Sequence, residues 1–253
     1  MGKTGMERYS RHIVLKKIGT AGQKRLLGAR VLVAGAGGLG SPAALYLAAA
    51  GVGTIGIADG DVVELSNLQR QILYRPNDVG GKKAESASRI LADFNPDVRV
   101  DVHDGFLTTG NIMDVIAPYD FILDGTDNLS SKFLINDACV TARKPFTFAG
   151  IGSFGGQMMT CIPGKGPCCR CVFGEPEKGA PNRRGGVVGA VCGVMGSLQA
   201  MEAIKFILGI GQPLAGRMLV YDALSSEFKL LRIPSVSDDC PLCGRNRPLY
   251  GRI

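Results

Sequence analysis

Four cysteines in two C-x-x-C pairs are spaced for metal chemistry. Cys168 and Cys171 form the first pair, and Cys240 and Cys243 form the second. Two such pairs can supply the four thiolates of a closed, tetrahedral zinc site, which is structural because it leaves no open position. The alternative is that the same thiols form disulfides. A zinc ion here would pin the C-terminal tail to the middle of the chain.

A glycine-rich turn followed by an acid is the second candidate site. Residues 35–40 read GAGGLG and match G-x-G-x-x-G, and Asp59 ends an apolar run. Glycines let a phosphate approach backbone N–H groups at a helix N-terminus, where the helix dipole favours negative charge. Asp59 stands where a carboxylate would bind a ribose. The pattern alone is weak, because glycine turns between strands and helices also serve packing.

The elements around this turn would bring it to one edge of a sheet. Residues 31–59 read as a strand, the turn, a helix that Ser41 and Pro42 would open as N-cap and first turn, and a second strand. Residues 121–124 form another short apolar strand, which would deliver residues 125–128 to its C-terminal end. Ligands of open α/β sheets bind at that edge.

Between these strands lies a polar segment with helix-start spacing. Ser66 and Gln69 are spaced as a capping box, which predicts a short helix that begins at Ser66. Asn67 and Arg70 are then three residues apart and share a face. A longer helix is expected to follow from about Lys83.

The order of elements predicts the fold class. Strands and helices alternate up to residue 150, which favours an α/β fold with a Rossmann-like, doubly wound, mostly parallel sheet. Beyond it, three strand-like runs and one long helix over residues 189–208 predict antiparallel C-terminal strands. We expect a single domain over residues 1–253, which consists of a helical N-terminal arm (1–30), a nucleotide-binding half (31–150) and a zinc-bearing half (151–253).

Composition limits the classes of partner. The net charge is +7, but the basic residues come in pairs and not in blocks, Trp is absent and aromatics are 6%. These features argue against a nucleic-acid partner and favour a polyphosphate ligand. The uncharged stretch 39–58 is broken by Pro42 and glycines, so no membrane span is predicted.

The cysteine count and the N-terminus indicate the compartment. Eight cysteines in such a chain point to a reducing environment and to metal or thiol chemistry more than to disulfides. The first eight residues have no apolar core and do not read as a signal peptide. We therefore expect a cytoplasmic protein. Cys169, between two candidate zinc ligands, is expected to point away from them.

Several motifs spread along the chain carry a family resemblance. They are Arg8-Tyr-Ser-Arg11, the GAGGLGS turn, Asp59-Gly-Asp61, Ser66-Asn67-Leu68-Gln69-Arg70-Gln71, Lys83, Thr126-Asp127-Asn128, residues 196–205 and the two cysteine pairs. In this combination the chain resembles, over nearly its whole length, the MoeB/ThiF/HesA family, bacterial relatives of ubiquitin-activating enzymes.

The resemblance implies an activity, and it makes residues 151–253 the carrier-binding half of the domain. The activity is the ATP-dependent adenylation of the C-terminal glycine of a small ubiquitin-like sulfur carrier ending in Gly-Gly, with release of pyrophosphate, by a homodimer that uses Mg²⁺ and Zn²⁺. Such carriers serve the biosynthesis of cofactors such as molybdopterin or thiamine. A carboxylate is ionised near neutral pH and needs no strong base, which suits a chain with two histidines. The reaction needs charge neutralisation, positioning and a metal on the pyrophosphate.

The resemblance also implies roles for single residues. The nucleotide site would comprise Gly38, Asp59, Asp61, Ser66, Asn67, Leu68, Gln69, Arg70, Lys83, Asp127 and Asn128. Asp59 would hold the ribose. Asn67, Arg70 and Lys83 would grip the phosphates. Asp127 would bind Mg²⁺, and Arg11 would reach into the partner subunit's site as an arginine finger. Asp61 either shapes the loop after its strand or assists the site, and Asp124 either ends its strand or does more.

Two departures from the family pattern bear on the mechanism. Many members carry a cysteine in the loop before the long helix, and residues 174–186 have none. The nearest, Cys192, lies in an apolar run typical of core. We therefore expect adenylation without a covalent enzyme–carrier step, and a mobile loop that closes over the carrier tail. Lys132 also replaces an Arg that often follows Asp-Asn.

Two other functions compete with this one. A nicotinamide-dependent oxidoreductase would explain Asp59 and the glycine turn, but it leaves Asn67, Arg70 and Lys83 without a role. A non-catalytic docking protein that keeps the fold would explain the missing loop cysteine.

Overall fold

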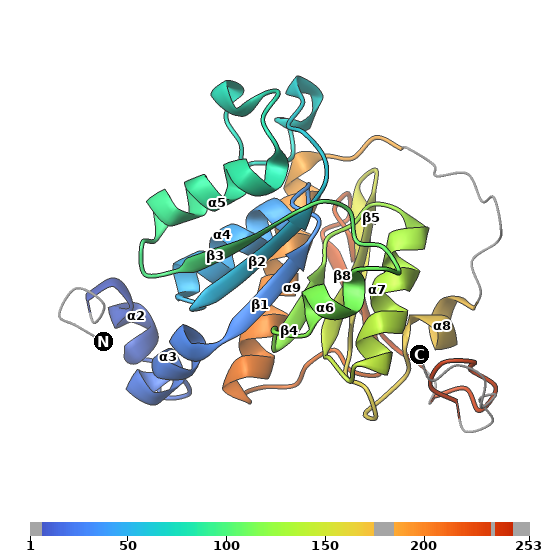
Figure 1. Ribbon diagram of the computed structural model, residues 1–253. Coiled ribbons are helices and arrows are strands. Elements are labelled where there is room, and N and C mark those ends of the chain that lie inside the picture. Colours follow the sequence, from blue (N-terminus) through green and yellow to red (C-terminus); the bar gives the residue numbers. More distant parts are fainter. Residues whose placement is uncertain (1–6, 175–184, 234–235, 245–253) are drawn as a thin grey trace.

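The centre of the molecule is one eight-stranded sheet with the order β3-β2-β1-β4-β5-β6-β7-β8 (Figure 1). The computed structural model describes residues 7–174, 185–233 and 236–244. The strands are β1 (Arg30–Ala34), β2 (Thr54–Asp59), β3 (Arg99–Asp104), β4 (Phe121–Asp124), β5 (Phe146–Gly152), β6 (Gly155–Cys161), β7 (Arg217–Asp222) and β8 (Glu227–Arg232). The first five pair in parallel and the last three antiparallel. The predicted fold class is confirmed.

Helices cover both faces of this sheet (Figure 1). They are α2 (Ser10–Ile13), α3 (Gly19–Gly28), α4 (Gly40–Ala50), α5 (Lys83–Phe94), α6 (Ile112–Ile116), α7 (Leu129–Thr141), α8 (Cys169–Phe173) and α9 (Gly189–Leu208), with short 3₁₀ turns η1 (Leu65–Asn67) and η2 (Pro76–Asp78). One apolar core joins α3, α4, α5 and α9 to the parallel strands, and a second joins α6, α7 and α8 to the other face.

The parallel strands are short apolar runs because both their faces are covered. Val31, Leu32 and Val33 in β1 are all fully buried, so alternate residues feed the two cores. In contrast, every residue of the edge strand β8 is exposed. The degree of cover thus falls from the centre of the sheet towards β8.

The long helix α9 is apolar enough to cross a membrane by length and composition alone. Half of its most apolar stretch is buried within the fold, as in a core helix. A single helix of this kind does not by itself indicate a membrane-spanning segment. It packs against α4 and against β4, β5 and β6. We therefore describe α9 as a core helix that lies under the candidate site.

The strand order reverses between β1 and β4, which are neighbours in the sheet although β2 and β3 separate them in sequence. Ala34 at the end of β1 pairs with Asp124 at the end of β4. Ligands of doubly wound sheets bind in the crevice beyond such a reversal. The glycine turn follows β1 and residues 125–128 follow β4, so both candidate segments meet at this crevice.

Candidate functional site

The first and last glycines of the turn are required by packing. Gly35 has a φ of +89°, and a Cβ on it would lie 3.0 Å from the carbonyl carbon of Gly125. A Cβ on Gly40 would lie 1.9 Å from the carbonyl oxygen of Gly35. These two glycines let the turn pack tightly on the loop after β4. Packing therefore explains two of the four glycines in residues 35–40.

The two middle glycines face side chains from other segments. A Cβ on Gly37 would lie 3.5 Å from the Nε2 of Gln71, and a Cβ on Gly38 would lie 3.0 Å from the Sγ of Cys192. Gln71 follows η1, and Cys192 belongs to the first turn of α9. The middle of the glycine turn is thus the place where three segments converge.

The Ala36 peptide within the turn is held at both ends. Its N–H donates to the Asp59 Oδ2 at 2.8 Å, and its carbonyl oxygen accepts from the Tyr74 hydroxyl at 2.9 Å. The other Asp59 oxygen accepts from the Asp61 N–H at 2.8 Å. Asp59 therefore lies at the turn as predicted, and its carboxylate already fixes the backbone to which a phosphate would bind.

The predicted N-cap of α4 is wrong. The helix begins at Gly40 with Leu39 in the N-cap position, and Ser41 lies inside the first turn. The hydroxyl of Ser41 donates to the carbonyl oxygen of Ala36 at 3.3 Å. Ser41 therefore holds the glycine turn and leaves the N–H groups of the helix N-terminus to other partners.

A buried lysine lies beside Asp59. Lys83, the first residue of α5, is 6% exposed, and its Nζ lies 2.9 Å from the Asp61 Oδ2. Burial raises the pKa of the Asp59 carboxyl, against the opposing attraction of Lys83 and two backbone hydrogen bonds. The Asp61 carboxylate therefore holds the Lys83 ammonium group, which interacts electrostatically with Asp59.

The polar segment after β2 forms a 3₁₀ turn that begins one residue before the predicted helix. The Oδ1 of Asn67 accepts from the Glu64 N–H at 3.2 Å, so Asn67 closes this turn where Gln69 was expected to do so. The guanidinium of Arg70 donates to the carbonyl oxygen of Ser66 at 3.1 Å. Asn67 is buried, and Arg70 is half-buried.

Two further predicted residues hold this segment against its surroundings. Leu68 packs on the core that includes α4 and α9. A Cβ on Gly189 would lie 2.4 Å from the carbonyl oxygen of Gln69, so the backbone of this segment contacts the start of α9. Leu68 and Gln69 therefore place the segment, and their neighbours Asn67 and Arg70 carry the polar groups.

Beyond β4, a buried ion pair supports the loop that carries Asp127. The Oδ2 of Asp124 lies 3.0 Å from the Lys132 Nζ, and both side chains are buried. The Oδ1 of Asp124 accepts from the Thr126 N–H at 3.0 Å and from its hydroxyl at 2.6 Å. Asp124 thus does more than end its strand, and Lys132 is its partner.

Asp127 is exposed at the end of this loop, at the same edge of the sheet as Asp59. Asn128 follows it as the N-cap of α7, where its Oδ1 accepts from the Ser131 N–H at 2.8 Å. Asp127 is therefore held between a buried ion pair and a helix cap.

Arg11 does not join the other candidates within the chain. Tyr9 beside it is buried against Gly51, and its hydroxyl accepts from the Asn95 Nδ2 at 2.9 Å. Gly51 and Asn95 follow the C-terminal ends of α4 and α5, whereas the glycine turn and Lys83 lie at their N-terminal ends. The arm with Arg11 is therefore anchored at the opposite edge of the sheet (Figure 1).

Three further residues lie at the site, although the sequence assigns none of them a role there. Gln71 and Tyr74 are buried against the glycine turn. Cys192 is fully buried, as expected for core, and burial raises the pKa of its thiol. Its contact with Gly38 could be found only from the fold, because α9 is distant in sequence from the turn.

The four cysteines of the C-x-x-C pairs form one cluster, and the Sγ atoms all lie within 4.8 Å of one another. The Sγ of Cys171 is 3.3 Å from that of Cys243, and the Sγ of Cys168 is 3.8 Å from that of Cys240. These separations exceed an S–S bond of about 2.05 Å, and they approach the roughly 3.8 Å edge of a tetrahedron with Zn–S bonds of about 2.3 Å. The donor set therefore fits zinc and not disulfides.

Contacts with α7 hold the first cysteine pair in place. The Nε and one terminal nitrogen of Arg170 donate to Asp137 at 2.8 and 2.7 Å. The N–H of Cys169 donates to the Asn136 Oδ1 at 2.8 Å, and the Cys169 side chain lies in the core, away from the cluster. One side of the cluster is thus tied to the sheet, and the side with Cys240 comes from the C-terminal segment.

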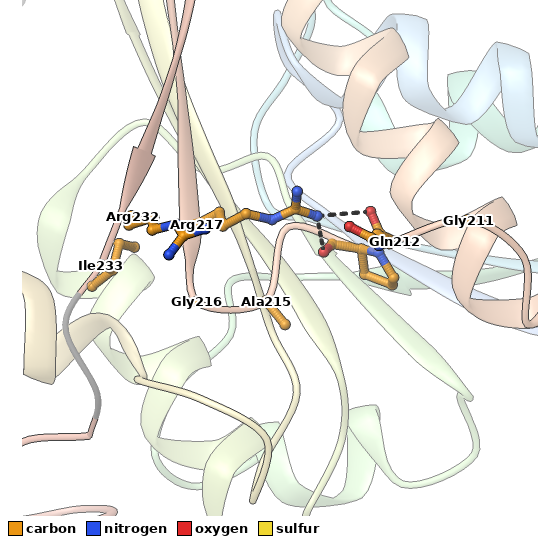
Figure 2. A pocket seen from close by; sticks show the side chains of 8 residues that line it. Gly211, Gln212, Ala215, Gly216, Arg217, Arg232 and Ile233 are labelled. Atoms are coloured by element: carbon orange, nitrogen blue, oxygen red, sulfur yellow. Dashed lines mark hydrogen bonds between the residues drawn. The ribbon is translucent and has the colours of Figure 1, made fainter.

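Two surface cavities lie outside the crevice. One, of 530 Å³, lies between the segment before β7 and the end of β8, and there the guanidinium of Arg217 donates to the carbonyl oxygens of Gln212 and Pro213 (Figure 2). The other, of 510 Å³, is an apolar groove lined by Pro42, Tyr46, Ile72, Ala190, Gly193, Val194, Ser197, Leu198 and Phe228. In the first cavity the Arg217 guanidinium is already hydrogen-bonded to its own loop. The second cavity, the apolar groove, adjoins the candidate site.

Similarity to known proteins agrees with this site. The chain is 44% identical over 242 residues to the adenylyltransferase and sulfurtransferase MOCS3-2 of Zea mays, covering 94% of the chain but 50% of that protein. It is 44% identical over 250 residues to the sulfur carrier protein adenylyltransferase of Thermus thermophilus, covering 96% and 92%. The chain thus spans about half the length of the maize relative and nearly all of the bacterial one.

A solved structure has the same fold. A crystal structure of E. coli MccB with ATP superimposes with a TM-score of 0.79 at 27% identity, covering 94% of this chain and 73% of that one. The family model for ThiF matches residues 9–242, which include the glycine turn, the buried lysine, the loop after β4 and three of the four clustered cysteines. The chain belongs to the ThiF family.

Proposed function

We propose that this protein adenylates the C-terminal carboxylate of a small ubiquitin-like sulfur carrier that ends in Gly-Gly, with ATP as the second substrate and pyrophosphate as a product. The main support is the convergence, at one topological reversal, of an acid at the end of β2, a buried lysine at the start of α5 and an exposed acid after β4. A relative at 44% identity is named for this activity.

The residues of the crevice would divide the work. Asp59 would accept from the ribose hydroxyls, since it already lies against the turn. Lys83, Arg70 and Asn67 would neutralise and position the phosphates. A carboxylate oxygen is a hard ligand that suits Mg²⁺, so Asp127 would hold this ion, which balances charge on the departing pyrophosphate.

No residue needs to act as a strong base. The carrier carboxylate is ionised near neutral pH and attacks the α-phosphorus directly, so catalysis would consist of positioning and charge neutralisation. Cys192 is fully buried. We therefore propose that the enzyme forms no thioester with the carrier, and that sulfur reaches the acyl-adenylate from another protein. The loop expected to close over the carrier tail spans residues 174–186, of which 175–184 lie outside the described residues.

We further propose a homodimer in which Arg11 acts in the partner's site. Arg11 is anchored at the edge of the sheet opposite the crevice, so it has no route to the phosphates of its own chain. The apolar groove over α4 and α9 exposes Tyr46, Ile72 and Phe228 by about half, and a second copy would cover it. The four-thiolate cluster suits the reducing cytoplasm, where we place the protein.

The test is carrier-dependent exchange of labelled pyrophosphate into ATP. We expect exchange with a carrier that ends in Gly-Gly and none when its last glycine is removed. Failure of every such carrier, together with binding of NADH, would instead favour an oxidoreductase. Binding of the carrier and ATP without exchange would favour a docking protein.

Mixing two inactive variants tests the role of Arg11 in trans. Arg11→Ala and Asp127→Ala homodimers should each lose exchange activity. After subunit exchange about half of the dimers are mixed, and one site in each is intact, so about a quarter of wild-type activity should return. Arg11→Ala with Arg70→Ala is a second pair that should behave alike. No recovery from either mixture would show that Arg11 does not act across subunits.

A further inference from the structure

Gln71 is a buried polar side chain at the crevice whose hydrogen bonds are incomplete. It is 4% exposed, and no donor reaches its Oε1 in the part of the chain that the structure describes. Its backbone is fixed, since its N–H donates to the Asn67 carbonyl oxygen at 2.9 Å. Buried polar atoms without a partner are rare, and each calls for a physical explanation.

The position of the Gln71 carboxamide suggests which ligand it contacts. The Nε2 lies 3.5 Å from the place where a Cβ on Gly37 would be. Gly37 is the second glycine of the G-x-G-x-x-G pattern, the position at which the backbone approaches the phosphates. The Gln71 carboxamide therefore borders the space that the absence of a side chain on Gly37 leaves open.

A second buried glutamine gives a contrast within the chain. Gln199 in α9 is fully buried, and its Oε1 likewise lacks a partner among the described residues. However, its Nε2 donates to the Asp124 carbonyl oxygen at 2.8 Å and to the Thr147 hydroxyl at 3.1 Å. Gln199 thus links β4, β5 and α9 through its carboxamide. The Gln71 carboxamide, which lies beside the glycine turn, makes no comparable link between elements among the described residues.

We propose that Gln71 contacts the nucleotide, with its carboxamide N–H₂ group donating to a phosphate oxygen at Gly37. This inference rests on the proposed function, because it assumes that a nucleotide binds at the turn. The Oε1, which has no donor among the described residues, would accept from a water of the hydrated cation that accompanies the phosphates. The incomplete hydrogen bonding of Gln71 is then a property of the protein without nucleotide.

The test is to replace Gln71 by an apolar side chain of similar length. Gln71→Met removes the hydrogen-bonding groups and fills the same space. For a residue that serves the ligand, the melting temperature without nucleotide should stay equal or rise, because a buried group without full partners is removed. The Kd for MgATP, measured by calorimetry, should rise about tenfold, as for the loss of one hydrogen bond to a charged group.

Two further variants make the result specific. Gln199→Met is the matched control, and it should lower the melting temperature while the Kd for MgATP stays within about twofold. Gln71→Glu keeps the shape and adds a negative charge, so it should weaken MgATP binding more than Gln71→Met does. Neither Gln71 variant should alter the Kd for adenosine, which has no phosphate.

The outcomes separate this inference from the proposed function. An unchanged Kd for MgATP in Gln71→Met overturns the inference, whatever the melting temperature does. Equal losses for MgATP and adenosine would also overturn it, since the contact would then not be with phosphate. If the wild-type protein binds no MgATP at all, the proposed function itself fails. Binding by the wild type with no difference in the variants rejects only the role of Gln71.

Discussion

The candidate nucleotide crevice and the cysteine cluster are held together in opposite ways. In the crevice, the protein's own groups hold each other: Asp59 holds the Ala36 peptide, and Asp61 holds the Lys83 ammonium group. In the cluster, the four thiols have one another as close neighbours, at 3.3 to 3.9 Å between several Sγ pairs. Thiols are weak hydrogen-bonding groups, so their contacts with one another contribute little to the stability of the cluster.

This difference indicates when each site forms. The crevice is fixed by buried hydrogen bonds and ion pairs and should keep its shape without nucleotide. The cluster joins α8, which is tied to α7 by Arg170, to the C-terminal segment that carries Cys240, and a metal held by all four thiolates would supply binding free energy for this link. We therefore expect metal to act on folding and nucleotide to act on a preformed site.

Metal removal should give the largest effect and separate the two regions. Structural zinc contributes on the order of 10 kcal/mol to the folding of small zinc sites. A chelator, or the substitution Cys240→Ser, should therefore expose the C-terminal segment to proteolysis. Mass spectrometry should show that each chain has lost one zinc ion. The Kd for MgATP should remain within about twofold in both cases, because the crevice forms without metal.

Cys139→Ser is the control for this experiment. Cys139 is a fully buried thiol outside the cluster, so its replacement should keep the zinc content. If zinc removal weakens MgATP binding as strongly as it exposes the C-terminal segment, the two regions are not independent and the contrast between them is wrong.

The buried ion pair under the Asp127 loop should give the next largest effect. Lys132→Met leaves the Asp124 carboxylate buried and without its cation, which costs about 3–5 kcal/mol of unfolding free energy. Lys132→Arg should restore much of this stability, because its guanidinium keeps a cation beside the Asp124 carboxylate. Denaturant unfolding measures both. A loss below about 1 kcal/mol in Lys132→Met would show that the pair does not hold the loop.

Loss of the buried lysine should affect activity and spare the fold. Lys83→Met removes one positive group from the phosphates and should lower pyrophosphate exchange about 10²-fold or more, as the loss of a single charge-stabilising donor does. Its partner variant, Asp61→Asn, keeps the lysine and should lower exchange less. A fall in melting temperature of more than a few degrees in Lys83→Met would mean that the ion pair is chiefly structural.

The sequence predicts the main elements of both regions because local residue patterns determine them. Apolar runs covered on both faces mark the parallel strands, and the spacing within each C-x-x-C pair marks the ligands. The caps at Ser41 and Ser66 are wrong because each hydroxyl found a partner other than the expected backbone N–H group.

Contacts between distant segments could not be predicted. The spacing of the glycines does not show that Gly35 and Gly40 serve packing while Gly37 and Gly38 face Gln71 and Cys192. That distinction depends on how close α9 and the segment after η1 come to the turn. The pairing of Lys132 with Asp124 is similar, since it needs α7 to return over the end of β4.

The smallest effect concerns the protonation of Asp59. Burial raises the pKa of this carboxyl above its ordinary value of 3.8, so over a window that starts near that value the folded chain keeps a proton that the unfolded chain has lost. The unfolding free energy should therefore fall as the pH rises through this window, relative to Asp59→Asn, which cannot titrate.

The affinity for ATP should change in the opposite direction, because only the ionised carboxylate accepts from two ribose hydroxyls. The wild-type Kd for ATP should therefore increase as the pH falls through the raised pKa of Asp59. Calorimetry of wild type and Asp59→Asn across this range checks both signs. Parallel pH profiles for the two proteins would contradict the raised pKa of Asp59.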